Sequence, residues 1–261
     1  MPELPEVEAY RLLAERALRR PIVQVDAPDA WFLKGGLDAG SVTAALEGRY
    51  FVAARRTGKL LLLDTAAGGP VLGLRFGMTG RLLVDGRAGV DKLLYTSDRD
   101  VATWDRFALR FADGGRLVVR DPRRLGGVLL DPPEAGLGPD ALTVTPAALR
   151  SALSDSEAPL KARLMDQARL AGVGNLLADE TLWRAGLDPR RPAGSLSAAE
   201  LRRLHRHLRS TLTDLIARGG SHTGDLRPAR TPGGVCPKDA TPLTRGIVGG
   251  RTTWWCPTHQ R

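Results

Sequence analysis

The chain has 261 residues and a formal net charge of +9, with 38 Lys and Arg residues against 29 Asp and Glu residues. This length is enough to bury a real core, in one large domain or two to three small ones. The sequence has no apolar run of about eighteen residues, and its N-terminus carries carboxylates where a signal peptide would be basic and then apolar. We therefore expect a cytoplasmic protein without a membrane span. The charge favours a polyanionic partner through counterion release, although a composition that simply prefers arginine would give the same excess.

The N-terminal half changes from a helical to a strand pattern. Apolar residues recur at helical spacing from residue 3 to 19, which predicts a first helix almost at the chain end. Short apolar runs follow from about residue 21 to 130 and predict strands. The turn residues 112–115 separate the runs 107–111 and 117–119, which indicates a β-hairpin.

Helical patterns dominate the C-terminal half. Pro and Gly residues between 131 and 158 predict a linker without regular structure. Helices are then expected over residues 159–170, 175–186 and 197–219, the last opening with a capping box. The glycine-rich segment from about residue 231, which also holds Thr, Ile, Val and Trp, indicates a small β-hairpin.

The first residues after Met1 combine a small proline with two carboxylates. Removal of Met1 would leave Pro2 with a secondary α-amine, which titrates far lower than a lysine side chain and is a competent nucleophile at neutral pH. Glu3 adjoins this amine and can make the proton transfers that such chemistry needs, while Glu6 lies one helical turn further on. A proline at a helix start, followed by acidic residues that favour the helix dipole, is the alternative interpretation.

Five motifs in one order distinguish these readings, and they occupy residues 1–8, 58–62, 74–80, 121–126 and 160–180. With them, the sequence resembles the formamidopyrimidine-DNA glycosylase and endonuclease VIII family along nearly its whole length. The resemblance implies an α+β multidomain fold. An N-terminal helix with a two-layered antiparallel β-sandwich is expected in residues 1–131, a helical helix-two-turns-helix domain in 132–225, and a C-terminal zinc-finger β-hairpin in 226–261.

The same resemblance implies a bifunctional DNA glycosylase and abasic-site lyase of base-excision repair. Pro2 would form a Schiff base with the damaged nucleoside, followed by β- and δ-elimination, with Glu3 and Glu6 in the same pocket. The implied DNA contacts divide by role. Lys59 would reach the backbone beside the flipped nucleotide, Met78, Arg123 and Leu125 would fill the hole in the duplex, and Lys161, Asn175 and Arg251 would hold phosphates.

Two departures from the family pattern concern lesion recognition. The formamidopyrimidine branch usually has Phe where this chain has Leu125, so stacking on the opposite strand should weaken. Only fifteen residues, 221–235, separate the Gly219-Gly220 stop of the last predicted helix from Cys236, whereas these enzymes carry a longer insertion that caps 8-oxoguanine. We therefore expect weak 8-oxoguanine excision, and better action on formamidopyrimidines, hydantoins, oxidised pyrimidines or abasic sites.

The C-terminal segment reads Cys236-x2-Asp239-x16-Cys256-x2-His259, in the register of the family's four-cysteine finger. Two such knuckles can present four donors to one structural zinc ion. Asp239 is an uncommon ligand in structural zinc sites, and His222 is the alternative fourth ligand. We expect no catalytic metal.

Two other functions remain open at this point. The departures at Leu125 and Asp239 leave room for a non-catalytic protein that binds DNA damage or abasic sites with the same fold. Helix-two-turns-helix elements also occur in a ribosomal protein, so an RNA-binding structural protein is the third possibility. For the enzyme, we expect double-stranded DNA with damaged bases or abasic sites as partner, a monomer, and a location at the bacterial nucleoid in the cytoplasm.

Overall fold

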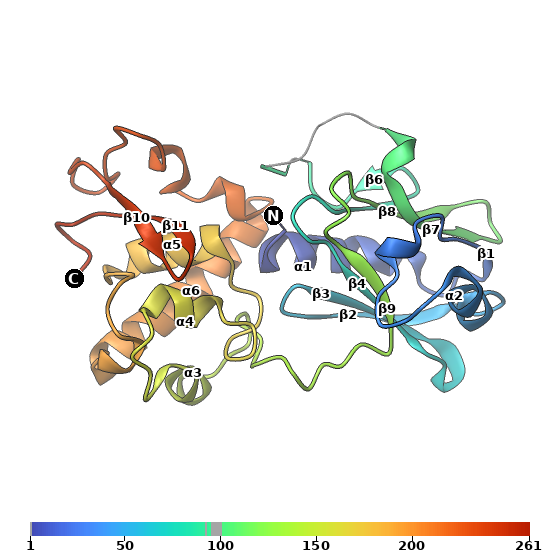
Figure 1. Ribbon diagram of the computed structural model, residues 1–261, viewed down its shortest axis with the longest axis horizontal. Coiled ribbons are helices and arrows are strands. Elements are labelled where there is room, and N and C mark those ends of the chain that lie inside the picture. The colour runs from blue at the N-terminus through green and yellow to red at the C-terminus, as the bar shows by residue number, and fades with distance from the viewer. Residues whose placement is uncertain (1, 92, 95–100) are drawn as a thin grey trace. The chain divides into compact units, whose positions relative to one another are not determined.

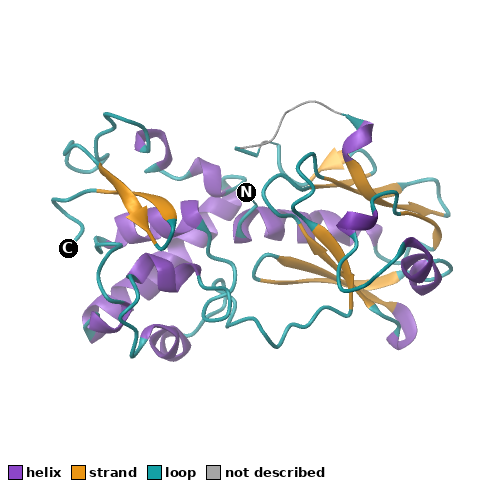
Figure 2. Cartoon of the chain, viewed as in Figure 1, coloured by secondary structure: helices purple, strands orange, loops and turns teal. Residues whose placement is uncertain are grey.

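The computed structural model describes residues 2–91, 93–94 and 101–261 (Figure 1). They form two compact units, one of Pro2 with Glu6–Glu134 and one of Glu3–Pro5 with Ala135–Arg261. Strands predominate in the first unit and helices in the second, as Figure 2 shows. The second unit therefore includes three residues from the N-terminus of the chain.

Two antiparallel sheets build the first unit. One has the strand order β1-β7-β8-β5-β6 and the other β2-β3-β4-β9. The strands are β1 (Ile22–Asp26), β2 (Phe51–Thr57), β3 (Leu60–Thr65), β4 (Val71–Arg75), β5 (Arg81–Val84), β6 (Arg87–Ala88), β7 (Asp105–Phe111), β8 (Arg116–Arg120) and β9 (Gly127–Leu130). The expected two-layered sandwich and the β7–β8 hairpin are confirmed.

One core joins both sheets to helix α1 (Leu4–Ala14), which the 3₁₀ turn η1 (Glu15–Ala17) extends. Val7 and Tyr10 of α1 are buried in this core together with leucines and phenylalanines of both sheets. Helix α2 (Ala39–Leu46) was not expected among the strands. Asp38 begins it by accepting a hydrogen bond from the Ser41 amide at 2.7 Å, an N-cap that the strand pattern concealed.

The second unit contains α3 (Pro146–Leu153), α4 (Leu160–Met165), α5 (Asn175–Ala185), α6 (Ala198–Ala217) and the hairpin β10 (Thr244–Val248) with β11 (Arg251–Trp255). The expectation of an irregular linker over 131–158 was wrong in its last part, because α3 lies there. Thr145 caps α3 through the Ala148 amide, and Pro146 occupies the first turn, where a proline costs no hydrogen bond. Helix α4 ends sooner than expected, since Asp166 adopts an extended conformation.

The remaining helices follow the sequence pattern closely. Gly186 ends α5 in the left-handed conformation, and Ser197 with Glu200 forms the expected capping box of α6. Four leucines of α6 are buried in the core of this unit, Leu204, Leu208, Leu212 and Leu215. Among the described residues, no helix combines the length and the apolar character that crossing a bilayer requires.

Candidate active site and metal-binding group

The carboxylate of Glu3 caps helix α5. Its two oxygens accept hydrogen bonds from the amides of Leu176 at 2.9 Å and Leu177 at 3.0 Å. Helix α5 has no side-chain cap of its own, because its N-cap residue is Gly174. The carboxylate therefore satisfies two unpaired amides and lies at the positive end of the helix dipole. A residue predicted to move protons is thus held at a fixed place beside Pro2.

The glycine turn before α5 is shaped to receive this N-terminal segment. The Leu4 amide donates to the Gly172 carbonyl at 3.2 Å, and Gly172 has a φ of +110°. A Cβ atom on Gly174 would lie 2.2 Å from Cδ of Glu3. The amides of Gly172, Leu176 and Leu177 all donate hydrogen bonds within the protein. The glycines serve the docking of Glu3 and Leu4.

Helix α1 is linked through Arg56 to the turn that carries Lys59, the predicted DNA-backbone lysine. Glu8 on α1 forms an ion pair with Arg56 of β2 at 2.8 Å, and Arg56 also donates to the carbonyl of Gly58 at 2.9 Å. Lys59 therefore follows a glycine that is tied to α1. It lies in the two-residue turn before β3 rather than within the strand, where its side chain is half-buried.

The loop that carries Met78 is tied to the same helix. The Tyr10 hydroxyl donates to the carbonyl of Gly80 at 3.1 Å, and its ring packs against Phe76 with centroids 4.4 Å apart. Burial, and then the nearby negative charge of Glu6, raise the pKa of Tyr10 well above its usual value. The hydroxyl therefore stays a neutral donor. The half-buried Met78 lies two residues before Gly80, whose carbonyl accepts this hydrogen bond.

Asp121 joins the Met78 loop to the loop that carries Arg123 and Leu125. Its buried carboxylate accepts hydrogen bonds from the Thr79 hydroxyl and the Arg123 amide with one oxygen, and from the amides of Leu125 and Gly126 with the other. Four donors on one carboxylate fix both loops in one arrangement. Asp121 opens the motif 121–126, but no local pattern in the sequence signals this role.

The ends of these loops remain accessible. Arg123 is exposed and Leu125 keeps 51% of its surface, while the backbone of Leu125 passes so close to Gly77 that a Cβ there would lie 2.4 Å from its carbonyl carbon. The structure thus brings together the three predicted hole-filling residues on two joined loops of the first unit.

Lys161 does not project into solvent. Its ammonium group is fully buried, 2.7 Å from a carboxylate oxygen of Asp179, and it donates to the Thr253 hydroxyl at 2.8 Å and the Thr252 carbonyl at 3.2 Å. Arg230 binds the other oxygen of Asp179 at 2.7 Å. Burial lowers the pKa of Lys161 and raises that of Asp179. Lys161 therefore holds strand β11, which begins at Arg251.

The other two predicted phosphate contacts lie at ends of elements in the same unit. Asn175 is the first residue of α5, with its side-chain oxygen buried and without a hydrogen-bond partner in the described part of the chain. Arg251 follows the Gly249-Gly250 turn and is exposed. The predicted site residues are thus divided. The first unit holds Pro2, Glu6, Lys59, Met78, Arg123 and Leu125, and the second holds Glu3, Lys161, Asn175 and Arg251.

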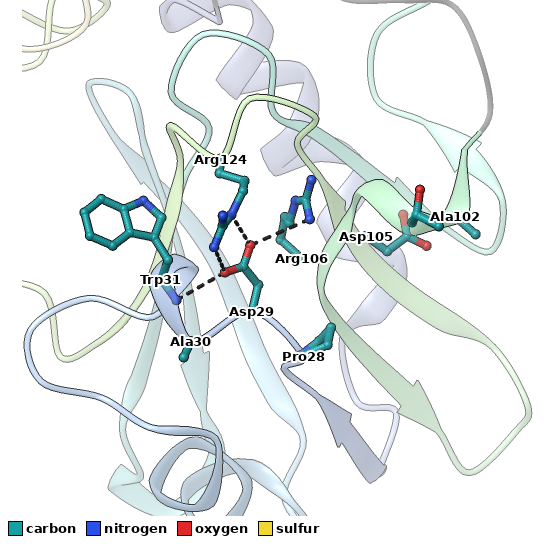
Figure 3. A pocket seen from close by; sticks show the side chains of 9 residues that line it. Pro28, Asp29, Ala30, Trp31, Ala102, Asp105, Arg106 and Arg124 are labelled. Carbon is teal, nitrogen blue, oxygen red and sulfur yellow. Dashed lines mark hydrogen bonds and ion pairs between the residues drawn. The ribbon is translucent and has the colours of Figure 1, made fainter.

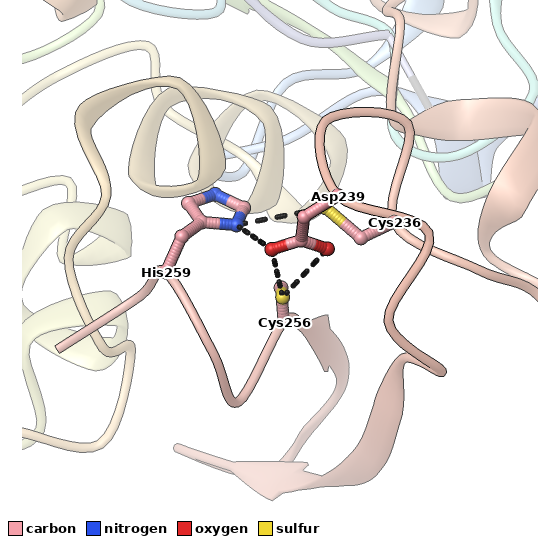
Figure 4. A group of neighbouring side chains, drawn as sticks. All are labelled: Cys236, Asp239, Cys256 and His259. Carbon is pink, nitrogen blue, oxygen red and sulfur yellow. Dashed lines mark hydrogen bonds and ion pairs between the residues drawn. The ribbon is translucent and has the colours of Figure 1, made fainter.

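Cys236, Asp239, Cys256 and His259 converge at the base of the C-terminal hairpin (Figure 4). One ligand atom from each lies within 4.8 Å of the others. His259 Nδ1 is 3.5 Å from the Cys236 sulfur and 3.3 Å from an Asp239 oxygen, and the Cys256 sulfur is 3.3 Å from the same oxygen. These four side chains form a group that can hold a metal ion.

The donor atoms fit a tetrahedral ion. Zinc bond lengths place neighbouring N, O and S ligands of a tetrahedron about 3.3 to 3.6 Å apart, close to the separations found here. His259 Nε2 is 3.1 Å from the Trp183 carbonyl, which can only accept, so Nδ1 is left to face the group. A hydrogen bond from the Thr241 amide is the main cause that lowers the pKa of Asp239 and keeps its carboxylate ionised. His222, the alternative ligand, is not part of the group among the described residues.

A sheet sandwich, a helical unit that receives the chain's N-terminus, and a cysteine-containing finger together define a helix-two-turns-helix DNA glycosylase. Residues 1–128 match the formamidopyrimidine-DNA glycosylase N-terminal domain, and residues 136–226 match the formamidopyrimidine-DNA glycosylase H2TH domain. The chain belongs to the formamidopyrimidine-DNA glycosylase family, whose members are DNA glycosylases of base-excision repair.

Similar proteins cover the whole chain. It is 36% identical over 283 residues to the formamidopyrimidine-DNA glycosylase of Chloroflexus aggregans, with 100% of this chain and 98% of that protein aligned. It is 35% identical to the Paracoccus denitrificans enzyme of that name over the full length of both. A crystal structure of Lactococcus lactis Fpg with an abasic site containing DNA has a TM-score of 0.82 at 25% identity, covering 99% of each chain.

Proposed function

We propose that this DNA glycosylase acts through the α-amine of Pro2 and is also an abasic-site lyase. The observation that carries the proposal is the capture of Glu3 by the amides of Leu176 and Leu177. The residue bonded directly to Pro2 is thereby fixed, so the amine has little freedom, and catalysis by a positioned nucleophile gains from that restriction. The relatives named formamidopyrimidine-DNA glycosylase support damaged bases in double-stranded DNA as substrate.

The chemistry needs one nucleophile and two proton carriers. The Pro2 nitrogen attacks C1′ of the damaged nucleoside, the N-glycosidic bond breaks, and its electron pair leaves with the base, which takes a proton. Opening of the sugar ring leaves an iminium ion. Loss of a C2′ proton then expels the 3′ phosphate, and a second elimination expels the 5′ phosphate. Glu3 and Glu6 are proposed to carry the protons, and Lys59 to bind the backbone beside the reacting sugar.

Contacts from several loops are proposed to hold the flipped nucleotide and its strand. Met78, Arg123 and Leu125 fill the gap in the duplex, and their loops are pre-organised by Asp121. Asn175 and Arg251 bind phosphates. Lys161 is assigned an indirect part, because its buried ammonium supports the strand that begins at Arg251.

The segment 221–235 is proposed to limit the lesions that are removed. It is short and anchored, with Glu180 accepting from the amides of Asp225 at 3.0 Å and Leu226 at 2.9 Å, while Asp179 holds Arg230. A full-length cap over 8-oxoguanine does not fit fifteen residues tied in this way. We expect slow 8-oxoguanine excision beside faster formamidopyrimidine, hydantoin or oxidised pyrimidine excision. Equal turnover of 8-oxoguanine and formamidopyrimidine opposite cytosine would overturn this point.

The metal-binding group is proposed to hold one structural zinc ion through Cys236, Asp239, Cys256 and His259. When bound, the ion would cross-link the two hairpin ends and stabilise the finger. We also propose that the chain divides into three parts at residues 131 and 225. A monomer is proposed because it suits one duplex per chain, and the proposed location is the bacterial nucleoid.

Borohydride trapping on duplexes with an abasic site or 5-hydroxyuracil tests the catalytic proposal. The mature protein should give a covalent adduct and cleaved strand, and Pro2→Gly or retention of Met1 should abolish both. Pro5→Ala, a change at the other N-terminal proline, is the matched control. Tight binding without an adduct would favour the non-catalytic damage-binding protein, and an adduct that survives both changes would exclude Pro2 as the nucleophile.

A further inference from the structure

Trp31 is an exposed indole on a rigid part of the first unit. It keeps 67% of its surface, whereas Trp183, Trp254 and Trp255 are each at most 7% exposed. The 3₁₀ turn η2 (Ala30–Phe32) fixes its backbone, because Asp29 accepts a hydrogen bond from the Trp31 amide at 3.1 Å and Phe32 is fully buried. An exposed aromatic surface on an ordered backbone is typical of a binding platform.

The same carboxylate connects Trp31 to the loop of Arg123 and Leu125. Asp29 binds the guanidinium of Arg124 with both oxygens, at 2.6 and 2.7 Å, and Arg124 is the residue between Arg123 and Leu125. Figure 3 shows the Trp31 indole to the left of Arg124 and Asp29, with Arg106 to their right, at a hollow that these residues line. The indole and the hole-filling loop are therefore positioned by one side chain.

The charges around the indole suit a polyanion. The Lys34 ammonium lies 4.7 Å from the centroid of the Trp31 ring and covers one of its faces, and the exposed Arg123 follows in the neighbouring loop. Asp29 forms ion pairs with both Arg124 and Arg106, whereas within the described part of the chain neither Lys34 nor Arg123 pairs with a carboxylate. Among the described residues, Lys34 thus has no carboxylate partner and lies against an exposed aromatic surface.

We propose that Trp31 is a further DNA contact, whose open face stacks on a base that the loop of Arg123 and Leu125 unstacks from the duplex. Lys34 then meets a phosphate beside that base. The assignment rests on the proposed function, because it needs the duplex to be opened at this loop. An indole suits the task since stacking on a base is strong and tolerates any sequence.

Tryptophan emission and binding together test the assignment. The probe is a duplex with a tetrahydrofuran abasic analogue, which the enzyme binds without turnover. Its addition should quench emission of the unmodified chain, and Trp31→Phe should remove that quenching while the dissociation constant stays within about threefold. Trp31→Ala should weaken binding about tenfold, and Lys34→Gln should lower the slope of log affinity against log salt by about one.

Tyr50→Ala is the matched control, because Tyr50 is an exposed aromatic of the same unit that is 41% exposed and does not line the hollow. Equal affinities of Trp31→Ala and Tyr50→Ala, or quenching that persists in Trp31→Phe, overturns the assignment. Self-association without DNA that Trp31→Ala abolishes would assign the indole to a second copy of the chain and also overturn it. Quenching through Trp31 without borohydride trapping would overturn only the catalytic proposal, and trapping without quenching only this one.

Discussion

Gly174→Ala tests the link between the glycine turn and the N-terminal carboxylate. The added Cβ would lie 2.2 Å from Cδ of Glu3, so the carboxyl group must retreat by about 1 Å to reach van der Waals contact. Its bonds to the amides of Leu176 and Leu177 are 2.9 and 3.0 Å long, and a displacement of that size breaks both. Each charge-assisted bond contributes about 1.5 to 3 kcal/mol, and water partly replaces them, so the second unit should lose about 3 kcal/mol.

The assay follows stability and chemistry in the same variant. Urea unfolding monitored by tryptophan emission reports mainly on the second unit, which holds Trp183, Trp254 and Trp255. Borohydride trapping should slow by at least about tenfold, because Glu3 no longer sits at a fixed place beside the amine. Gly136→Ala is the matched control, since a Cβ there meets nothing within 4 Å. If the two alanine variants match in unfolding and in trapping rate, Glu3 capture has no part in stability or catalysis.

Four further changes address other contacts of the structure. Asp121→Asn should lower the free energy of unfolding by about 2 kcal/mol and should slow base removal more than strand cleavage at a ready-made abasic site. Thr79→Val should show a smaller effect of the same kind. An equal loss in both reactions would contradict a role of Asp121 in holding the loops. Lys161→Met should lower the free energy of unfolding by about 3 to 5 kcal/mol, because Asp179 keeps a buried charge with one partner fewer. Urea unfolding measures the loss, and Arg163→Met, which removes a half-buried cation of the same helix, is the control. Equal losses in the two variants would contradict the prediction. The hydrogen bond from Arg191 is the main cause that lowers the pKa of Glu200 to about 2. The stabilisation by this ion pair is therefore complete above the unfolded-state pKa of about 4.3 and is lost as the pH falls toward 2. Glu200→Gln should remove about 1 kcal/mol of pH-dependent stability, and an acid unfolding profile equal to that of the unmodified chain would refute this. Metal analysis should find one zinc ion per chain, which Asp239→Cys should retain and Cys256→Ser should lose. Removal of the ion by a chelator should unfold the C-terminal hairpin and change the emission of Trp183, whose indole contacts Cys236. A chain without metal, or emission that a chelator leaves unchanged, would contradict the assignment.

Local patterns predicted much of the fold because they act within a few residues. The capping box at Ser197, the stop at Gly186 and the hairpin turn between β7 and β8 are all signalled by neighbouring side chains. Helix α2 was missed because its short apolar run looks like the strands around it. Helix α3 was missed because the prolines and glycines before it dominated the interpretation of the whole stretch.

The motifs gave the candidate site residues, whose roles stay predictions, but not the contacts that hold these residues in place. Glu3 and Asp121 lie within the motifs, but the sequence does not show their hydrogen-bond partners, which are distant in the chain; for Glu3 one partner is the amide of Leu176 in the first turn of α5. Lys161 shows the limit most clearly, since a lysine in a helix predicts an exposed cation and only the fold reveals Asp179 and Thr253 around it. Trp31 carried no motif at all, and its exposure is a property of the folded surface.

The binding of the Glu3 carboxylate to the N-terminus of α5 constrains the order in which the chain can be translated and folded. Glu3 is translated before the amides that bind its carboxylate, which lie 173 and 174 positions later in the sequence. Contacts of such sequence separation form late, because a long loop must close first. Glu3 thus cannot be fixed until the glycine turn before α5 and the first turn of α5 have been translated, so a truncated product would lack the contacts that hold the neighbour of the proposed nucleophile, Pro2.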